Sequence, residues 1–209
     1  MHSKLATYTR LLAAWPGLVS GPPEPLVEDC LVLLGYLEDA RTLLDVGAGG
    51  GMPGLPLAIA RPDLRVTLLE ADRRKAAFLV HAAASLELDV EVVAERAETA
   101  ARGRLREAFD VATCRALGSL PVVAELCLPF VRVGGRVLAM RGEADEAGAA
   151  AAAVALLGGG HARTVAAPSA ARSRGVVLTV PKVGPTPPAY PRRPGVPNRR
   201  PLGTARRYP

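Results

Sequence analysis

This chain of 209 residues has few cysteines and aromatic residues and no long uncharged apolar run. Its three cysteines, Cys30, Cys114 and Cys127, are odd in number and lack metal-ligand spacing, so we expect neither a disulfide framework nor a metal site. No run of about 18 apolar residues is free of charge, and the N-terminus lacks the basic-then-apolar layout of a secretory signal. We therefore expect a cytoplasmic protein that does not bind a membrane.

Acidic residues are missing from residues 181–209, which hold nine of the 19 prolines and seven of the 26 basic residues. Residues 1–180 are nearly balanced, with 19 basic and 20 acidic residues, so the net charge of +6 is a property of the tail. The prolines exclude a helix there and favour an extended arm that can follow a polyanion. A solvated, disordered terminus is the alternative. The basic residues of this tail are Lys182, Arg192, Arg193, Arg199, Arg200, Arg206 and Arg207.

Alternating apolar strands and helix-like segments predict an α/β fold with one sizeable core. The order of these segments favours a parallel sheet with right-handed crossovers and an antiparallel pair at its edge. We expect a helical cap at 1–40, a Rossmann-like domain at 41–180 and a tail at 181–209. The expected strands are 42–46, 65–69, 90–94, 110–114, 136–140, 161–165 and 175–180. The expected helices are 4–15, 25–37, 55–60, 73–86, 120–131 and 143–157.

A glycine-rich loop follows the first predicted strand and precedes a helix-like run. Gly47, Gly49 and Gly51 permit a tight turn and leave no Cβ between a ligand and the helix behind it. Glu70, at the end of the next strand, can accept hydrogen bonds from both ribose hydroxyls of an adenosine. Asp45 disfavours a pyrophosphate and suits the cationic S-adenosylmethionine. A nicotinamide or flavin site, or a structural loop without a ligand, remain alternatives.

Two arginines end predicted strands, Arg115 in CRAL and Arg141 in AMRG. Because the carboxyl ends of parallel strands meet at one edge, their guanidinium groups could converge on an anionic substrate. A solvated surface charge is the alternative for Arg115. After the third strand, the segment 94–98 could hold an adenine edge, or form only a charged turn.

The residues that many methyl transfers require are absent near this edge. No Asn or Asp followed by Pro-Pro-aromatic comes after the fourth strand, as methylation of an exocyclic amine usually needs. Cys114 could serve as the nucleophile for a pyrimidine carbon, although free cysteines are more often buried packing residues. His2, His81 and His161 have no visible partner for general-base catalysis. These absences favour an acceptor that is already nucleophilic, such as a guanine N7, which needs alignment rather than deprotonation.

The chain resembles the bacterial glucose-inhibited division protein B family in five segments: DVGAGGGMPGLPLAIARPDLRVTLLEA, RAE, FDVATCRALGSL, LPFVRVGGRVLAMRG and KVGPTPPAYPRRPGVPNRRPL. The resemblance implies a class I S-adenosylmethionine-dependent methyltransferase, with a Rossmann-like sheet, helices on both faces, a short N-terminal helical segment and a basic proline-rich tail. The implied reaction is methylation of guanosine-527 N7 in 16S ribosomal RNA. The implied partner is this RNA or the 30S subunit, and we expect a monomer.

The resemblance also implies roles for individual residues. Glu70 would take the ribose hydroxyls, and Arg115 and Arg141 are the candidate catalytic residues. Arg141 stands where the family usually has a lysine. The residues expected to bind or adjoin S-adenosylmethionine are Asp45, Gly47, Gly49, Gly51, Met52, Glu70, Ala97, Glu98 and Arg115. The expected RNA-facing rim is Arg73, Arg74, Arg96, Arg115 and Arg141.

The N-terminal region departs from the family pattern, because it has no Arg-His pair and only Asp29-Cys30 matches, weakly. Three functions therefore stay open besides the implied one. The chain could methylate another RNA, methylate a small molecule, or act as a non-catalytic RNA-binding assembly factor. The small-molecule alternative predicts that the basic tail is dispensable.

Overall fold

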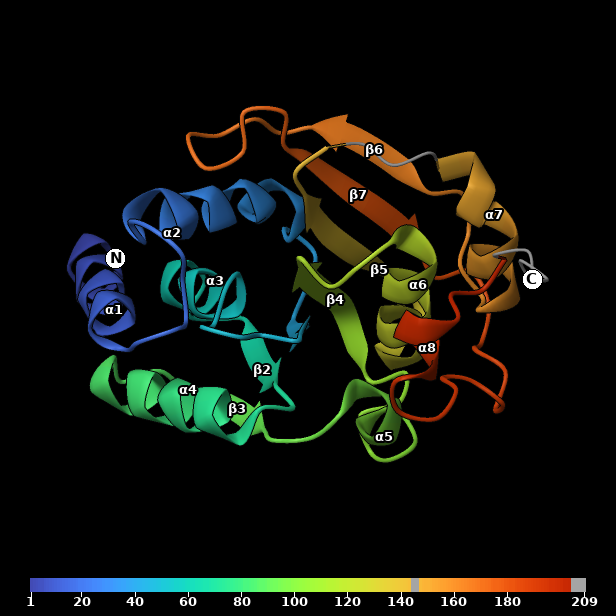
Figure 1. Cartoon of the computed structure of the whole chain (residues 1–209), viewed down its shortest axis with the longest axis horizontal. Helices are drawn as coiled ribbons and strands as arrows, with labels where there is room; N and C mark the ends of the chain where they lie inside the picture. The colour runs from blue at the N-terminus through green and yellow to red at the C-terminus, as the bar shows by residue number, and fades with distance from the viewer. Residues whose placement is uncertain (144–146, 204–209) are drawn as a thin grey trace.

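The computed structural model describes residues 1–143 and 147–203, and they contain a seven-stranded sheet in the order β3-β2-β1-β4-β5-β7-β6 (Figure 1). Strands β1 to β5 are parallel, and β7 runs antiparallel between β5 and β6. The predicted α/β sheet with an antiparallel edge is therefore confirmed. The strands are β1 Thr42–Val46, β2 Arg65–Leu69, β3 Val90–Val93, β4 Phe109–Arg115, β5 Val131–Arg141, β6 Arg163–Ala166 and β7 Val176–Pro181.

Helices cover both faces of the sheet, because successive residues of a strand point to opposite sides. Leu43 of β1 belongs to the core beneath α1 to α4, and Leu44 belongs to the core beneath α5 to α7. The helices are α1 His2–Ala14, α2 Glu24–Cys30, α3 Gly54–Ala60, α4 Arg73–Ser85, α5 Ala97–Ala100, α6 Leu120–Cys127, α7 Ala147–Leu156 and α8 Val196–Arg199, with 3₁₀ helices η1 Leu31–Tyr36 and η2 Leu128–Phe130. The predicted helix 143–157 includes residues 144–146, which lie outside the described part.

The N-terminal helices share a core with the rest of the fold rather than forming a separate one. Tyr8 of α1 is fully buried, and its hydroxyl donates a hydrogen bond of 2.5 Å to the carbonyl oxygen of Gly50. Val27 of α2 lies in the same core as Leu57 of α3. This N-terminal region therefore packs directly on the glycine-rich loop.

The prediction of an extended C-terminal arm is wrong for the described part of the tail. Lys182 is 1% exposed, and Arg192 forms an ion pair of 2.5 Å with the fully buried Glu125 of α6. A short helix, α8, also forms in spite of the prolines. Buried hydrogen-bond acceptors of the domain, such as the carboxylate of Glu125, hold the tail against α6. Figure 1 shows the tail beside this helix. Arg206 and Arg207 lie outside the described residues.

Candidate functional site

The loop between β1 and α3 has the tight glycine geometry that the sequence predicts. Gly47, Gly49 and Gly51 have φ values of 72°, 58° and 92°. A Cβ on Gly51 would lie 2.5 Å from a methyl carbon of Leu55. All three positions therefore favour glycine for backbone conformation, and Gly51 requires it for space as well.

Glu70 joins this loop to the turn that precedes α4. Its Oε2 accepts a hydrogen bond of 2.8 Å from the amide of Gly49, and its Oε1 accepts one of 2.8 Å from the amide of Asp72. Each carboxyl oxygen has a further lone pair, so Glu70 can still accept hydrogen bonds from ligand hydroxyls. The acid thus positions the loop and remains available as an acceptor.

Asp45 lies beneath the loop and is fully buried. Its Oδ2 accepts a hydrogen bond of 2.8 Å from the amide of Gly54, at the start of α3, and its Oδ1 has no partner among the described residues. Burial raises the pKa of this carboxyl to about 7, and the nearby Glu70 adds to the rise. This position favours a role in holding the loop over direct contact with a ligand.

A pocket of about 190 Å³ opens at the carboxyl ends of β1 and β2. It brings together four of the residues that the sequence predicts for cofactor binding, Gly47, Glu70, Ala97 and Glu98. The other predicted residues lie elsewhere: Met52, for example, packs half-buried against the core beneath α1 to α4. The pocket has one wall that the sequence did not predict. This wall is Asn198 of the tail. The other lining residues are Leu117 from the β4–α6 connection, Glu95 and Arg96 of the predicted segment 94–98, and Val46, Leu69, Ala71 and Leu126.

Glu98 connects this pocket to the tail. Its Oε1 accepts hydrogen bonds from the guanidinium of Arg96, at 3.0 Å, and from the amide of Gly195, at 2.8 Å. Its Oε2 is buried and has no partner among the described residues. Burial alone would raise the pKa of Glu98, but the bonds from Arg96 and Gly195 hold it below its ordinary value. The carboxylate is therefore ionised near neutral pH and has one free acceptor.

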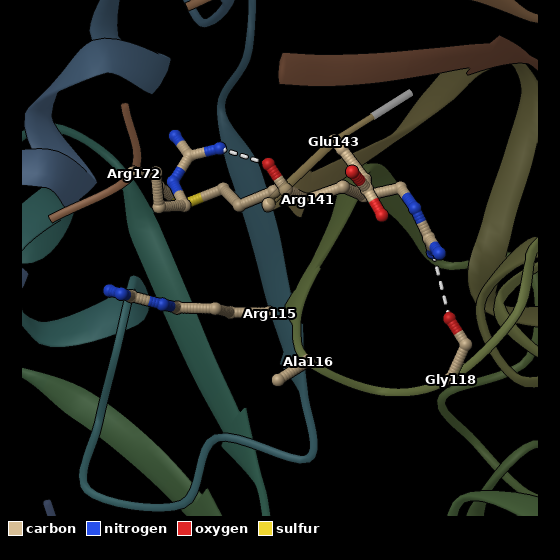
Figure 2. Close-up of a pocket in the computed structure, with 8 residues that line it drawn as sticks. Arg115, Ala116, Gly118, Arg141, Glu143 and Arg172 are labelled. Atoms are coloured by element: carbon tan, nitrogen blue, oxygen red, sulfur yellow. Dashed lines mark hydrogen bonds between the residues drawn. The ribbon is translucent and has the colours of Figure 1, made fainter. Parts of the chain in front are cut away.

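A second pocket, of about 370 Å³, lies at the carboxyl ends of β4 and β5 (Figure 2). Arg115 and Arg141 both line it, but Figure 2 shows that their side chains point in opposite directions. Arg115 donates to the carbonyl oxygen of Leu26 in α2 at 3.2 Å, and Arg141 donates to that of Gly118 at 2.7 Å. The predicted convergence of the two guanidinium groups is therefore wrong, because oxygens on different elements hold each of them.

Arg172 is a residue of this second pocket that the sequence analysis missed. It donates to both carboxylate oxygens of the buried Asp29, at 2.7 and 2.9 Å, and to the carbonyl oxygen of Arg141 at 2.5 Å. Asp29 also lies 3.6 Å from a guanidinium nitrogen of Arg115. The only sequence signal was the pair of acids Glu28 and Asp29 in the otherwise apolar segment 25–37. Asp29 thus joins α2 to two arginines of the pocket.

Cys114 does not reach either pocket. It is 1% exposed and lies in the core beneath α6, together with Cys127. The alternative of a nucleophilic thiol is therefore excluded, and all three cysteines are free and buried.

The two pockets share a wall made by the β4–α6 connection. Leu117 lines the first pocket, whereas its neighbours Ala116 and Gly118 line the second. A Cβ on Gly47 would lie 3.0 Å from Leu117, so the glycine loop touches this wall. A ligand in one pocket would therefore lie next to a ligand in the other.

Within residues 1–143 and 147–203 no three His, Cys, Asp or Glu side chains gather to hold a metal ion. No helix in this part is long and apolar enough to span a membrane.

Sequence comparisons give one consistent result. The family model described as GidB, rRNA small subunit methyltransferase G, matches residues 22–173. The ribosomal RNA small subunit methyltransferase G of Moorella thermoacetica is 45% identical over 184 residues, which cover 84% of this chain and 76% of that protein. The protein of the same name from Roseiflexus sp. is 47% identical, covering 81% and 74%. That from Lacticaseibacillus paracasei is 43% identical, covering 84% and 74%.

Solved structures at lower identity share the fold. The O-methyltransferase TomG from Streptomyces achromogenes, in complex with SAM, has a TM-score of 0.58 at 22% identity, over 87% of this chain and 90% of that chain. The S-adenosylmethionine-dependent methyltransferase SibL, in its apo form, has a TM-score of 0.62 at 18% identity, over 88% and 70%. The predicted class I methyltransferase fold with a Rossmann-like sheet is confirmed.

Proposed function

Since this chain belongs to the rRNA small subunit methyltransferase G family, we propose that it methylates N7 of guanosine-527 in the 530 loop of 16S ribosomal RNA, with S-adenosylmethionine as methyl donor. Family membership supports the reaction class and the RNA. The choice of the N7 atom rests on the chemistry of the second pocket.

The first pocket fits the adenosine end of the cofactor. Gly47 leaves room beside the loop, Glu70 offers carboxylate oxygens to ribose hydroxyls, and Glu98 has a buried acceptor oxygen without a partner. Ala97 lies beside them in the same pocket. When bound, S-adenosylmethionine supplies a methyl group activated by a positively charged sulfur. The role of this chain is to hold donor and acceptor in adjoining pockets.

The second pocket carries the proposal for the acceptor atom. Among the described residues that line it there is no histidine or cysteine, and its cations are the arginines 115, 141 and 172. Arginine stays protonated in proteins and cannot act as a general base. Its one carboxylate, Glu143, is exposed and paired with Arg174 at 2.9 Å. Guanine N7 has a lone pair and requires no base, so alignment can supply most of the catalysis.

The surface suits RNA. Basic side chains are exposed on α4, on the turn before α5 and on the tail, where they can contact phosphates. They are Arg73, Arg74, Arg96, Arg193, Arg199 and Arg200. Because the described tail is part of the fold, its deletion cannot test the small-molecule alternative, and single substitutions of exposed arginines are needed instead.

Transfer of a labelled methyl group from S-adenosylmethionine to 16S RNA and to 30S subunits, both lacking this modification, tests the proposal. We expect label in the RNA of at least one substrate. Cofactor binding without transfer to either substrate would contradict the proposal and favour the non-catalytic assembly factor.

A further inference from the structure

The C-terminal segment, defined here as residues 190–203, forms a wall of the pocket that suits adenosine. Its contribution is Asn198, which lies in α8 and lines the pocket together with Glu70 and Glu98. Figure 1 shows α8 beside α6. Residues that are far apart in the sequence therefore meet at this pocket.

Two buried carboxylates hold this segment in place. Glu125 of α6 is fully buried and accepts hydrogen bonds from Arg192 through its amide at 2.9 Å, its Nε at 2.8 Å and its Nη2 at 2.5 Å. Glu98 accepts a bond of 2.8 Å from the amide of Gly195, which has a φ of 79°. These bonds fix the segment that carries Asn198 to Glu125 of α6 and to Glu98 of the pocket.

The chemistry of the wall matches the edge of an adenine. An asparagine amide offers both a donor and an acceptor, as an adenine edge does. The buried Oε2 of Glu98 offers a further acceptor, because its other oxygen already binds Arg96 and Gly195. Asn198 is exposed, so its side-chain amide is accessible to a ligand.

We propose that Asn198 is a further cofactor-binding residue, which contacts the adenosine of S-adenosylmethionine from the C-terminal segment. Glu98 acts as the link, because its Oε1 holds the segment through the amide of Gly195 and the same residue lines the pocket. This inference rests on the cofactor named above, and it is independent of which RNA is methylated.

Calorimetric titration with S-adenosylhomocysteine tests the proposal in the full-length chain. We expect Asn198→Ala to weaken binding by about three- to tenfold, the effect of losing one or two hydrogen bonds. Its melting temperature without ligand should equal that of the wild type, because Asn198 is exposed. Arg199→Ala is the matched control: it lies next in α8 and does not line the pocket. It should bind S-adenosylhomocysteine as the wild type does.

Steady-state kinetics give a second readout that a structural role would not produce. Asn198→Ala should raise KM for S-adenosylmethionine and leave KM for RNA unchanged. Equal ligand affinity in Asn198→Ala and the wild type, or equal weakening in both variants, would overturn the assignment. A wild-type protein that does not bind S-adenosylhomocysteine would instead contradict the proposed cofactor, so the two failures are distinguishable.

Discussion

At the residue scale, the pKa values of two buried carboxyl groups near the first pocket are shifted in opposite directions. Asp45 and Glu98 each have one hydrogen-bonded oxygen and one without a partner among the described residues. The pKa of Asp45 is raised to about 7 by burial, whereas the guanidinium of Arg96 helps to hold the pKa of Glu98 below its usual value. The bonds from Arg96 and Gly195 thus keep Glu98 charged at neutral pH, whereas Asp45 is only partly ionised there.

The raised pKa of Asp45 predicts a pH-dependent stability. Because the folded protein prefers the protonated acid, this stabilisation is complete below pH 3.8 and is lost as pH rises to about 7. Asp45→Asn keeps an acceptor for the amide of Gly54 and removes the titration. Between pH 4 and 7.5, the variant should therefore gain stability relative to the wild type, by at most about 4 kcal/mol. Denaturant unfolding at several pH values measures this difference, and parallel curves would contradict it.

Arg172 and Arg174 both lie in the connection between β6 and β7, and they allow a buried ion pair to be compared with an exposed one. Arg172 is buried on Asp29, whereas the side chain of Arg174 is 81% exposed on Glu143. Arg172→Met should cost about 3 kcal/mol or more of unfolding free energy, because it leaves a buried carboxylate with only the more distant Arg115. Arg174→Met should change it by less than about 0.5 kcal/mol. Chemical denaturation of both variants measures the two losses of unfolding free energy. A loss in Arg172→Met as small as that expected for Arg174→Met would show that Asp29 does not need Arg172.

The residues that could be predicted from sequence are those whose role is local. The positive φ of Gly47 follows from the loop pattern, and Glu70 from its place after a strand. Arg172 and Asn198 could not be predicted in this way. The partner of Arg172 is 143 positions away, and only the folded tail brings Asn198 to its pocket.

At the scale of elements, the strands could be predicted from local sequence patterns, whereas the structure of the tail could not. Apolar runs predicted central strands such as β1 and β2, because burial on both faces demands such runs, whereas the edge strand β6 is exposed along its length. The tail was predicted wrongly because proline was taken only as a helix breaker. Proline is well tolerated at the first turn, and Pro197 stands there in α8.

Lys182 holds the start of the tail against the domain, and its lowered pKa predicts that stability depends on pH in the alkaline range. Its ammonium donates to the carbonyl oxygens of Leu128 and Leu157, at 3.0 and 3.2 Å, and to the hydroxyl of Thr186. Burial lowers its pKa from 10.5 to about 8, against the opposing effect of Glu107. Between pH 8 and 10.5 the unfolded chain therefore binds more protons, and stability should rise with pH.

Lys182→Met should abolish that rise while lowering stability at neutral pH, because carbonyl oxygens lose their donor. Thermal unfolding from pH 7 to 10 compares the variant with the wild type. A rise that persists in Lys182→Met would assign it to another group.

At the scale of the whole molecule, the basic tail forms part of the wall of the first pocket and does not lie apart from the domain. Arg193, Arg199 and Arg200 are exposed on the segment that also carries Asn198. Replacing all three with glutamine should weaken RNA binding and reduce its dependence on salt, by about one to three units of the log–log slope. Binding of S-adenosylhomocysteine should not change. RNA binding measured from low to high salt checks this, and an unchanged slope would locate the RNA surface elsewhere.

The most direct test of the central claim is to map the methyl group. After reaction of the purified protein with S-adenosylmethionine and unmodified 30S subunits or 16S RNA, digestion and mass spectrometry identify the nucleoside, and chain cleavage at N7-methylguanosine locates it. We expect N7-methylguanosine at guanosine-527 and nowhere else in the RNA. A methyl group on another atom would contradict the assignment of an acceptor that needs no general base, and one on another nucleotide would contradict the assignment of the target.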